Sequence, residues 1–246
     1  MKRTKQTEQV ISIALFDILG FSNMVEQKSA QTILDLYNKL REYLSEKSVE
    51  GGWVTAVPYD GVWSGGANKL VGVLYPLAIH SAYASDTFMM WADISQMRGH
   101  PDATALHIFL DAVQWFFCKA LENGIPLRGA VATGEALMDK EKSIYFGKAL
   151  VEAAKGENAQ LAIGISYGPS VIKYPPMLSS YILPFSSHIK NGKEALLSKR
   201  IVNWVHFWEN NKEFSGTDVI DRINKMNLET NFSIYYETAI KIVNFA

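Results

Sequence analysis

Cysteine is almost absent from this sequence, which has one, Cys118, among 246 residues. A single thiol excludes a disulfide within the chain and is typical of proteins from a reducing compartment. Because Cys118 stands in the apolar run of residues 113–118, we expect a buried core thiol and not a nucleophile. An excess of charge of one sign is also absent, since the formal net charge is −1. The chain therefore has no general electrostatic attraction to nucleic acid or to an anionic membrane surface.

Long hydrophobic runs are absent as well. The longest apolar stretch, residues 71–84, contains Pro76 and His80, so it is too short and too interrupted to cross a membrane. The basic N-terminal stretch MKRTKQTEQV has no apolar segment of the kind that a signal peptide needs. Zinc-ligand spacing, a G-x-S-x-G elbow and a P-loop are not found in the sequence. We therefore expect a soluble, cytoplasmic protein that binds neither membrane nor nucleic acid.

What the chain does contain is the composition of a packed globular protein, with 48% hydrophobic and 12% aromatic residues. Strand-like and helix-like segments alternate without strict strand–helix–strand order, which predicts an α+β fold with a mainly antiparallel sheet. The predicted strands are 10–16, 74–84, 87–93, 126–135, 143–146 and 162–166, with an added strand at 201–208. The predicted helices are 29–49, 102–123, 147–158 and 229–245, and residues 53–72 and 167–184 are predicted loops.

The most informative stretch is ISIALFDILGFS, residues 11–22. A nearly continuous apolar run with β-branched members, typical of a central strand buried on both faces, ends in Asp17. A carboxylate at the end of such a strand is costly to bury, so Asp17 needs a cation, hydrogen bonds or water, or else it caps the short helix that follows. A second carboxylate, Asp86, stands among apolar residues where a hairpin would bend between two strands.

Two embedded carboxylates and a glycine-containing turn suggest a site for a metal ion and phosphate. Mg²⁺ and Mn²⁺ take oxygen ligands, typically from one or two carboxylates and from substrate phosphates. Backbone N–H groups at the start of a helix suit an anionic triphosphate. The candidates for this contact are Leu19, Gly20, Phe21 and Ser22.

These residues carry a family resemblance. The stretch FDILGFS at residues 16–22 resembles the F-x-D-I-x-G-F-[ST] motif of class III nucleotide cyclases, and Ser85-Asp86 occupies the position of that family's Gly-Asp turn. The stretch LRGAVATG at residues 127–134 is similar to the family's strand ending in G-I-h-x-G. The resemblance implies the cyclase catalytic fold, a ferredoxin-like or palm-type βαββαβ core within residues 1–166. It further implies that 167–246 form a C-terminal extension packed on that core, not an independent domain.

The resemblance also implies a two-metal mechanism. Asp17, Asp86 and the backbone carbonyl of Ile18 would hold two divalent cations, Mn²⁺ or Mg²⁺. Arg128 would hold the substrate triphosphate, although a structural arginine at an exposed edge is the alternative. The ribose 3′-hydroxyl would attack the α-phosphorus and give a 3′,5′-cyclic nucleotide and pyrophosphate. Because sites in this family are shared across a head-to-tail dimer, the resemblance implies a homodimer with two equivalent sites.

Several positions depart from the family pattern. Ala82 stands where purine cyclases have a base-reading lysine, and Ile144 stands at the second base-reading position. Tight recognition of adenine or guanine therefore has no evident source. Val151 replaces the asparagine that orients the ribose, and Lys155 replaces the transition-state arginine. Lys155 or Lys148 would then supply the transition-state positive charge.

The missing purine readers and the GKALVEA segment at residues 147–153 look like the pyrimidine cyclases of bacterial anti-phage (Pycsar) signalling. This branch implies a cyclic UMP or cyclic CMP product, with UTP the favoured substrate, that activates a separate effector protein which the cyclase does not bind directly. Tyr59 and Tyr83 would help to fill a narrower pocket by stacking, and Arg98 is a further candidate substrate contact. Turn, packing and solvated-loop roles are the alternatives for Tyr59 and Arg98.

Two other functions stay open. The chain can be a degenerate cyclase-homology module that binds metal and nucleotide and regulates a partner without turnover, or an adenylate cyclase with a divergent pocket. Decayed sites usually lose the metal-binding carboxylates, and here both Asp17 and Asp86 are present, which favours the active enzyme.

Overall fold

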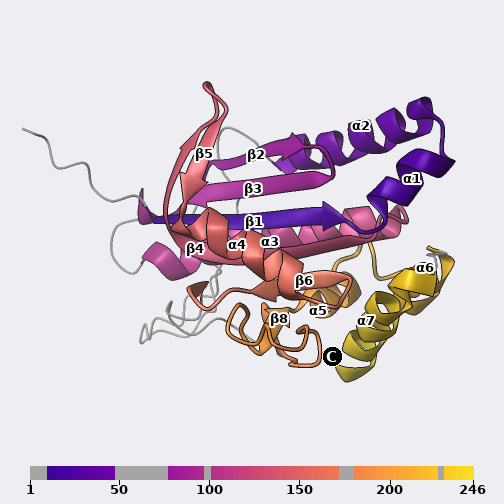
Figure 1. The fold of residues 1–246 in the computed structure, drawn as a ribbon. Coiled ribbons are helices and arrows are strands. Elements are labelled where there is room, and N and C mark those ends of the chain that lie inside the picture. The colour runs from indigo at the N-terminus through magenta and orange to yellow at the C-terminus, as the bar shows by residue number, and fades with distance from the viewer. Residues whose placement is uncertain (1–9, 48–76, 97–100, 172–179, 227–229) are drawn as a thin grey trace, which may run out of the picture.

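The computed structural model describes residues 10–47, 77–96, 101–171, 180–226 and 230–246 (Figure 1). The strands are β1 (Val10–Ile18), β2 (Ile79–Ala84), β3 (Thr87–Asp93), β4 (Leu127–Asp139), β5 (Ile144–Gly147), β6 (Gly164–Tyr167), β7 (Ile182–Pro184) and β8 (Arg200–Val202). The helices are α1 (Phe21–Gln27), α2 (Ala30–Lys47), α3 (Pro101–Glu122), α4 (Lys148–Ala159), α5 (Trp204–Asn210), α6 (Val219–Lys225) and α7 (Ser233–Phe245). Within these residues no helix is long and apolar enough to cross a bilayer.

The strands form a sheet of order β2-β3-β1-β4-β6-β8-β7, and β5 pairs with β4 as a hairpin. The pairs β2–β3, β3–β1 and β1–β4 are antiparallel, and β6 runs parallel to β4. Along the chain, β1, the helices α1 and α2, β2, β3, α3 and β4 follow one another in βαββαβ order, with β3 and β1 as the two inner strands of these four. This is the ferredoxin-like arrangement, and the expected α+β class with a mainly antiparallel sheet is confirmed.

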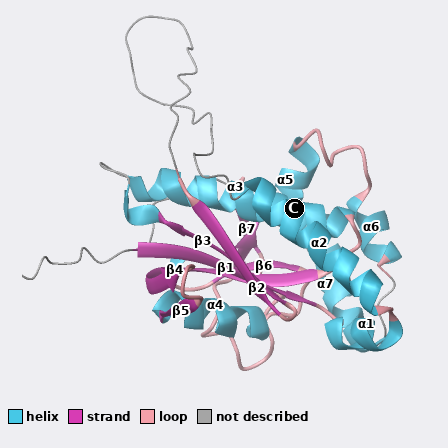
Figure 2. Ribbon diagram, turned by 90° about the horizontal axis from the view of Figure 1, so that it is seen from above, coloured by secondary structure: helices cyan, strands magenta, loops and turns pink. Residues whose placement is uncertain are grey.

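Each face of the sheet is covered by helices (Figure 2). Even-numbered residues of β1 such as Ala14 and Phe16 join the large core cluster to which α3 contributes many side chains. Odd-numbered residues such as Ile13 and Leu15 join a smaller cluster with Ala153 of α4. Because side chains alternate between faces along a strand, this division assigns every residue of β1 to one side of the sheet or the other. Asp17 belongs to the face that α4 covers.

The elements after β6 extend the same sheet and core. Strand β8 pairs with β6, and β7 pairs with β8. Ala239 and Ile242 of α7 are buried in the cluster that contains Phe16 of β1. Figure 1 shows α6 and α7 beside each other at one end of the molecule. The C-terminal helix therefore packs near the end of β1 at which Asp17 lies, a contact described below.

The predicted strand at residues 201–208 is wrong for most of its length. Strand β8 ends at Val202, and helix α5 begins at Trp204. The Asn203 side chain accepts a hydrogen bond from the His206 amide at 3.3 Å, which caps the helix. Trp204 and Trp208 are both buried, whereas His206 between them is exposed. This pattern fits a helix, because on a strand residues 204, 206 and 208 would all lie on one face.

Smaller differences concern element ends. The strand predicted at 74–84 begins at Ile79 within the described part, and the strand predicted to end at 135 continues to Asp139 because it forms the hairpin with β5. Part of the predicted loop 167–184 is strand β7. Cys118 is buried in α3, as expected. The predicted loop 53–72 lies outside the described residues.

Candidate functional site

Asp17 lies near the end of the central strand β1, between β3 and β4. It is opposite Thr87 on one side and opposite Arg128 on the other. Arg128 Nη2 donates to Asp17 Oδ2 at 2.9 Å, and the two side chains are only 11% and 21% exposed. The helix α1 that follows has Gly20 at its N-cap and no capping side chain. Asp17 is therefore the partner of a buried arginine, and the interpretation of Asp17 as a helix cap is wrong.

Asp86 lies in the turn between β2 and β3, and a backbone hydrogen bond ties it to the end of β1. The Ile18 amide donates to the Asp86 carbonyl oxygen at 3.2 Å. The preceding residue, Ser85, has a φ of 55°, and its carbonyl accepts a hydrogen bond from the Tyr37 hydroxyl. The pKa of Tyr37 is raised to about 12, mainly by burial and in addition by the negative charges of Asp86 and Asp17. The sheet thus brings together the two carboxylates that the sequence singled out.

Arg128 also pairs with a third carboxylate, Glu157 of α4. Arg128 Nε and Glu157 Oε1 form an ion pair in which the Glu157 side chain is 5% exposed. Sequence reasoning missed this residue. The signal was available, since Glu157 follows the buried Ala149 and Ala153 at intervals of four residues and so lies on the inner face of the helix.

Tyr235 of α7 also belongs to the cluster. Arg128 Nη1 donates to the Tyr235 hydroxyl oxygen at 3.3 Å, and the guanidinium carbon lies 5.7 Å from the centre of the Tyr235 ring. Nothing in the sequence pairs residues 128 and 235, so this contact could be found only from the structure.

The electrostatics of the cluster are those of a site with excess negative charge. The pKa of Asp17 is raised to about 7, first by burial and then by the charges of Glu157 and Asp86, while Arg128 lowers it. Burial also raises the pKa of Glu157, and Arg128 acts against this shift. A divalent cation beside Asp17 and Asp86 would relieve their repulsion, so this donor set fits Mg²⁺ or Mn²⁺. Among the described residues no group of three or more His, Cys, Asp or Glu side chains is placed to hold one metal ion.

The turn after β1 is partly engaged in the fold. The Leu19 amide donates to the Pro126 carbonyl oxygen at 3.0 Å, and the Leu19 side chain is buried, so this amide is already occupied. Gly20 has a φ of 74°, a left-handed conformation that glycine adopts without strain, and it directs the chain into α1. Phe21 and Ser22 are the first residues of that helix, and Ser22 is exposed.

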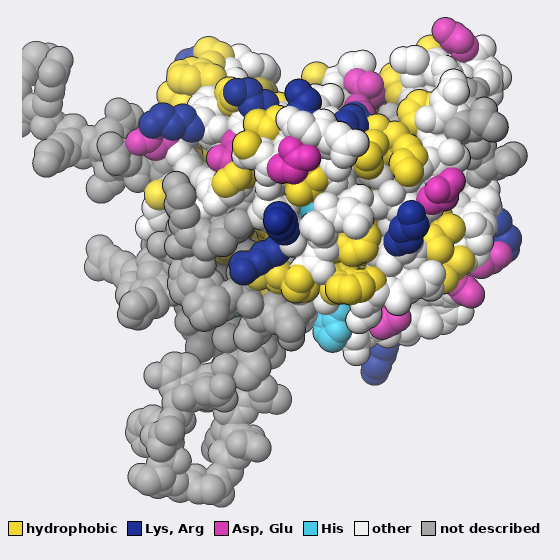
Figure 3. Space-filling model, turned by 60° about the horizontal axis from the view of Figure 1, so that its bottom comes forward, with side chains coloured by type: hydrophobic (Ala, Val, Ile, Leu, Met, Phe, Trp, Pro, Cys, Tyr) yellow, Lys and Arg dark blue, Asp and Glu magenta, His cyan; other side chains and the backbone are white. Residues whose placement is uncertain are grey.

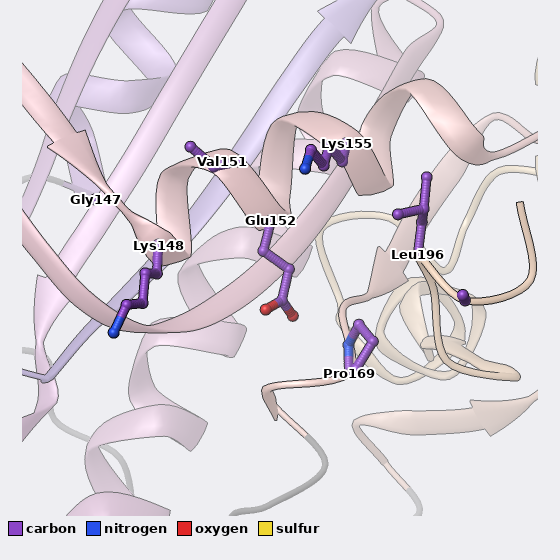
Figure 4. A pocket seen from close by; sticks show the side chains of 8 residues that line it. Gly147, Lys148, Val151, Glu152, Lys155, Pro169 and Leu196 are labelled. Atoms are coloured by element: carbon purple, nitrogen blue, oxygen red, sulfur yellow. The ribbon is translucent and has the colours of Figure 1, made fainter.

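The two lysines of α4 that were predicted to supply the transition-state charge, Lys148 and Lys155, lie on the outer side of the helix. Figure 4 shows Lys148, Glu152 and Lys155 around a cavity of about 590 Å³. The cavity is lined by Gly147, Lys148, Val151, Glu152, Lys155, Pro169, Ala195 and Leu196. Lys148 pairs with Glu135 at 2.8 Å. Lys155 is exposed, whereas Glu157, two residues further along, is buried against Arg128. The structure therefore does not bring Lys155 to Asp17 of its own chain.

The predicted base-contacting residues are not gathered at one place. Ala82 pairs with Met89 and is on the same face of the sheet as Asp17. Tyr83 faces the other side, where it stacks on Phe88 at 6.1 Å between ring centres and lies under the Arg41 guanidinium at 5.5 Å. The alternation of a strand thus separates Tyr83 from the Asp17 side chain.

Ile144 is 44% exposed on the hairpin strand β5. Tyr59 and Arg98 lie outside the described residues.

The surface in Figure 3 shows single basic side chains dispersed among acidic and hydrophobic ones. The described residues on this face form no continuous basic track of the kind that nucleic acid requires.

No protein-family model matches the sequence, and no curated protein matches it. Solved structures of cyclases do match in fold. A bacterial light-regulated adenylyl cyclase aligns at 13% identity over 89% of this chain and 98% of its own, with a TM-score of 0.49. The catalytic core of a rhodopsin-guanylyl cyclase with converted specificity, in complex with ATPαS, aligns at 10% identity over 72% and 84%, with a TM-score of 0.45. The guanylate cyclase domain of RhGC from Catenaria anguillulae, in complex with GTP, aligns at 11% identity over 72% and 85%, with a TM-score of 0.42. These identities and scores are too low to assign a family, so the activity of this chain has to be inferred from its own residues.

Proposed function

We propose that this chain is a nucleotide cyclase of the class III type that converts a pyrimidine nucleoside triphosphate to its 3′,5′-cyclic nucleotide and pyrophosphate. UTP is the favoured substrate and CTP the second. The product is proposed to act as a second messenger in anti-phage defence that activates a separate effector protein. This last part of the proposal is based only on the resemblance of the sequence to the Pycsar cyclases.

The observation that carries the proposal is the meeting of Asp17 and Asp86 at one end of the central strands, with Arg128 beside Asp17. Two carboxylates from different strands and an adjacent guanidinium are suited to a metal-bound triphosphate, because the carboxylates attract cations and the planar guanidinium suits phosphate oxygens. The sequence motifs that suggested cyclase chemistry contribute all three of these side chains.

Asp17, Asp86 and the Ile18 carbonyl are the groups that would hold two divalent cations, Mn²⁺ or Mg²⁺. When bound, such cations neutralise charge on the triphosphate and lower the pKa of the ribose 3′-hydroxyl. The small number of protein ligands agrees with cations that are also held by substrate phosphates.

In the proposed reaction the 3′-hydroxyl oxygen forms a bond to the α-phosphorus, and the bond from that phosphorus to the pyrophosphate oxygen breaks. Arg128 would hold the triphosphate, with the N–H groups of Gly20, Phe21 and Ser22 at the start of α1 as further candidates. Because Lys155 is exposed on the outer face of α4, it is proposed to act in the site of the opposite subunit of a homodimer, with Lys148 beside it.

The proposed base preference is supported by what lies on the Asp17 face of the sheet. Ala82 is small and apolar, and it packs beside the cluster that contains Leu15 and Met89. A purine selected by hydrogen bonds needs a buried polar partner, and Ala82 offers none. Tyr59 and Arg98 are the proposed contacts of the pyrimidine, on the basis of the resemblance alone.

The decisive experiment incubates the purified protein with Mn²⁺ and each of the four ribonucleoside triphosphates and identifies products by mass spectrometry. We expect a cyclic pyrimidine nucleotide from the wild type, and a loss of about 100-fold or more in Asp17→Asn and in Asp86→Asn. Asp93→Asn is the matched control, because Asp93 is opposite Ile11 at the far end of the same strands and accepts hydrogen bonds from Ser95. It should retain activity.

A cyclic purine would preserve the chemistry and overturn the base preference. Nucleotide binding without any product would favour the second candidate, a module that binds metal and nucleotide and regulates a partner. One observation favours that candidate: Asp17 already has Arg128 as its counter-ion. Full activity in Asp17→Asn would contradict the proposed site.

A further inference from the structure

The three nitrogen positions of the Arg128 guanidinium each have a different partner, and each partner comes from a different part of the fold. Nη2 donates to Asp17 of β1, Nε pairs with Glu157 of α4, and Nη1 donates to Tyr235 of α7. Two hydrogen bonds, to Asp17 and Tyr235, and an ion pair with Glu157 restrain the orientation of this planar group more than a single ion pair does.

Tyr235 differs from the other two partners because it is neutral and contacts Arg128 in two ways. Its hydroxyl oxygen accepts a hydrogen bond at 3.3 Å, and its ring lies 5.7 Å from the guanidinium carbon. It therefore restrains Arg128 without adding negative charge to a site that already holds the carboxylates of Asp17 and Glu157. Lys190 also lies against this ring, 5.9 Å from its centre.

The backbone of Tyr235 is itself attached to the sheet. The Ile163 amide, immediately before β6, donates to the Tyr235 carbonyl oxygen at 3.4 Å. Helix α7 begins two residues before Tyr235. Further along the same helix, Ala239 and Ile242 are fully buried in the main core. The tyrosine hydroxyl is thus presented to Arg128 from a fixed helix.

We propose that Tyr235 is a positioning residue for Arg128, so that the C-terminal helix α7 is part of the machinery that binds the triphosphate. The inference rests on the proposed function, in which cations occupy the Asp17 carboxylate. When Asp17 binds a cation, the Nε and Nη1 groups of Arg128 keep their contacts with Glu157 and Tyr235. The Nη2 group is then available to donate to a phosphate oxygen in a constant orientation.

The test compares Tyr235→Phe with Tyr236→Phe. Both substitutions remove one tyrosine hydroxyl from the same turn of α7. Among the described residues, however, the buried Tyr236 hydroxyl has no hydrogen-bond partner, whereas that of Tyr235 accepts from Arg128. The probe is inorganic triphosphate with Mg²⁺, measured by titration calorimetry, because it reports on phosphate binding without base, ribose or turnover. We expect Tyr235→Phe to weaken its binding by about three- to tenfold and Tyr236→Phe to leave it unchanged.

A double-mutant cycle separates positioning from general structure. In an Arg128→Lys background the charge is kept but the fork is lost, so Tyr235→Phe should have no further effect on inorganic triphosphate. As a single substitution in the active enzyme, Tyr235→Phe should raise KM for every accepted nucleotide by the same factor, because in the proposed site Arg128 contacts the triphosphate and not the base. Unfolding temperatures are measured in parallel, and a lower temperature with unchanged phosphate affinity would mean that Tyr235 is merely structural.

The inference would be overturned by equal affinities of Tyr235→Phe and the wild type, or by an undiminished Tyr235→Phe effect in the Arg128→Lys background. It would also fall if the wild type did not bind inorganic triphosphate. Failure of the proposed function is distinguishable, since a wild type that binds inorganic triphosphate through Arg128 and Tyr235 but forms no cyclic product would contradict catalysis alone.

Discussion

At the scale of single residues, the candidate site is defined by an excess of carboxylates over guanidinium groups, and one of these carboxylates, Glu157, is buried. Arg128 is shared by Asp17 and Glu157, and Asp86 adds its charge to theirs. Burial, which penalises the charged form, is the main reason that the pKa of Asp17 is raised in spite of its arginine partner, and the negative charges of Glu157 and Asp86 raise it further. Such a site is unfavourable as a purely structural feature and is understandable as a place for a cation.

His188 offers a separate prediction about stability, away from the candidate site. Its side chain is fully buried, and burial lowers its pKa from 6.5 to about 4. Because the folded pKa is below the unfolded one, the contribution of His188 to stability is complete above the unfolded pKa and is lost as the pH falls toward 4. We expect the wild type to lose about 2 to 3 kcal/mol from this group between pH 7 and about pH 4.5.

The measurement is denaturant unfolding over that pH range for the wild type and for His188→Phe, which keeps an aromatic side chain of similar size. Other groups titrate in both proteins, so the difference between the two pH profiles isolates His188. The variant should lose less stability at low pH. If the unfolding free energies of the two proteins changed with pH in parallel, His188 would have the same pKa in the folded and the unfolded protein, and the prediction would be wrong.

At the scale of elements, α4 connects the candidate site to the sheet. Its inner face packs on β4, and a Cβ atom on Gly156 would lie 2.9 Å from Leu197 Cδ2 and 3.0 Å from Ala130 Cβ. A side chain at this position would force the end of the Leu197 side chain and Ala130 to shift. The next residue is Glu157, so the distance between α4 and β4 also determines how Glu157 meets Arg128.

We expect Gly156→Ala to destabilise the protein and to lower kcat/KM. Alanine gains about 1 kcal/mol of helix propensity, but overpacking against Ala130 costs about 1 to 3 kcal/mol. The net loss should be about 1 kcal/mol in denaturant unfolding. Gly216→Ala is the control, because a Cβ there meets nothing within 4 Å. A Gly156→Ala protein with unchanged stability and activity would show that α4 is not seated as tightly as its contacts indicate.

The same elements show how far sequence alone can go. Local patterns were sufficient for β1, β3 and α4, since apolar runs and helical spacing are properties of neighbouring residues, and the turn holding Asp86 was predicted with them. The pairing of Arg128 with Glu157 and Tyr235 was not predictable, because it joins residues 29 and 107 positions apart through the packing of two helices. The face on which Tyr83 lies depends on strand register, which the sequence did not determine.

At the scale of the whole molecule, the orientation of α4 separates Lys155 from the Asp17 side chain of the same chain. Lys155 is exposed on the outer side of the helix, while Asp17 faces its inner side. Residues two positions apart on a helix point about 200° apart, so the helix that buries Glu157 against Arg128 has to direct Lys155 away from it. If Lys155 contributes to catalysis, it does so at a site that another subunit supplies.

This arrangement predicts complementation between two inactive variants. Asp17→Asn lacks the cation-binding carboxylate, and Lys155→Ala lacks the proposed transition-state cation, so each homodimer should be inactive. A heterodimer of the two has one site with both defects and one site with neither. Mixing should therefore restore activity toward half the wild-type value per heterodimer, measured as pyrophosphate release after subunit exchange has been verified by mass spectrometry of tagged chains. A Lys155→Ala homodimer with wild-type activity, or verified heterodimers without activity, would contradict a site shared through α4.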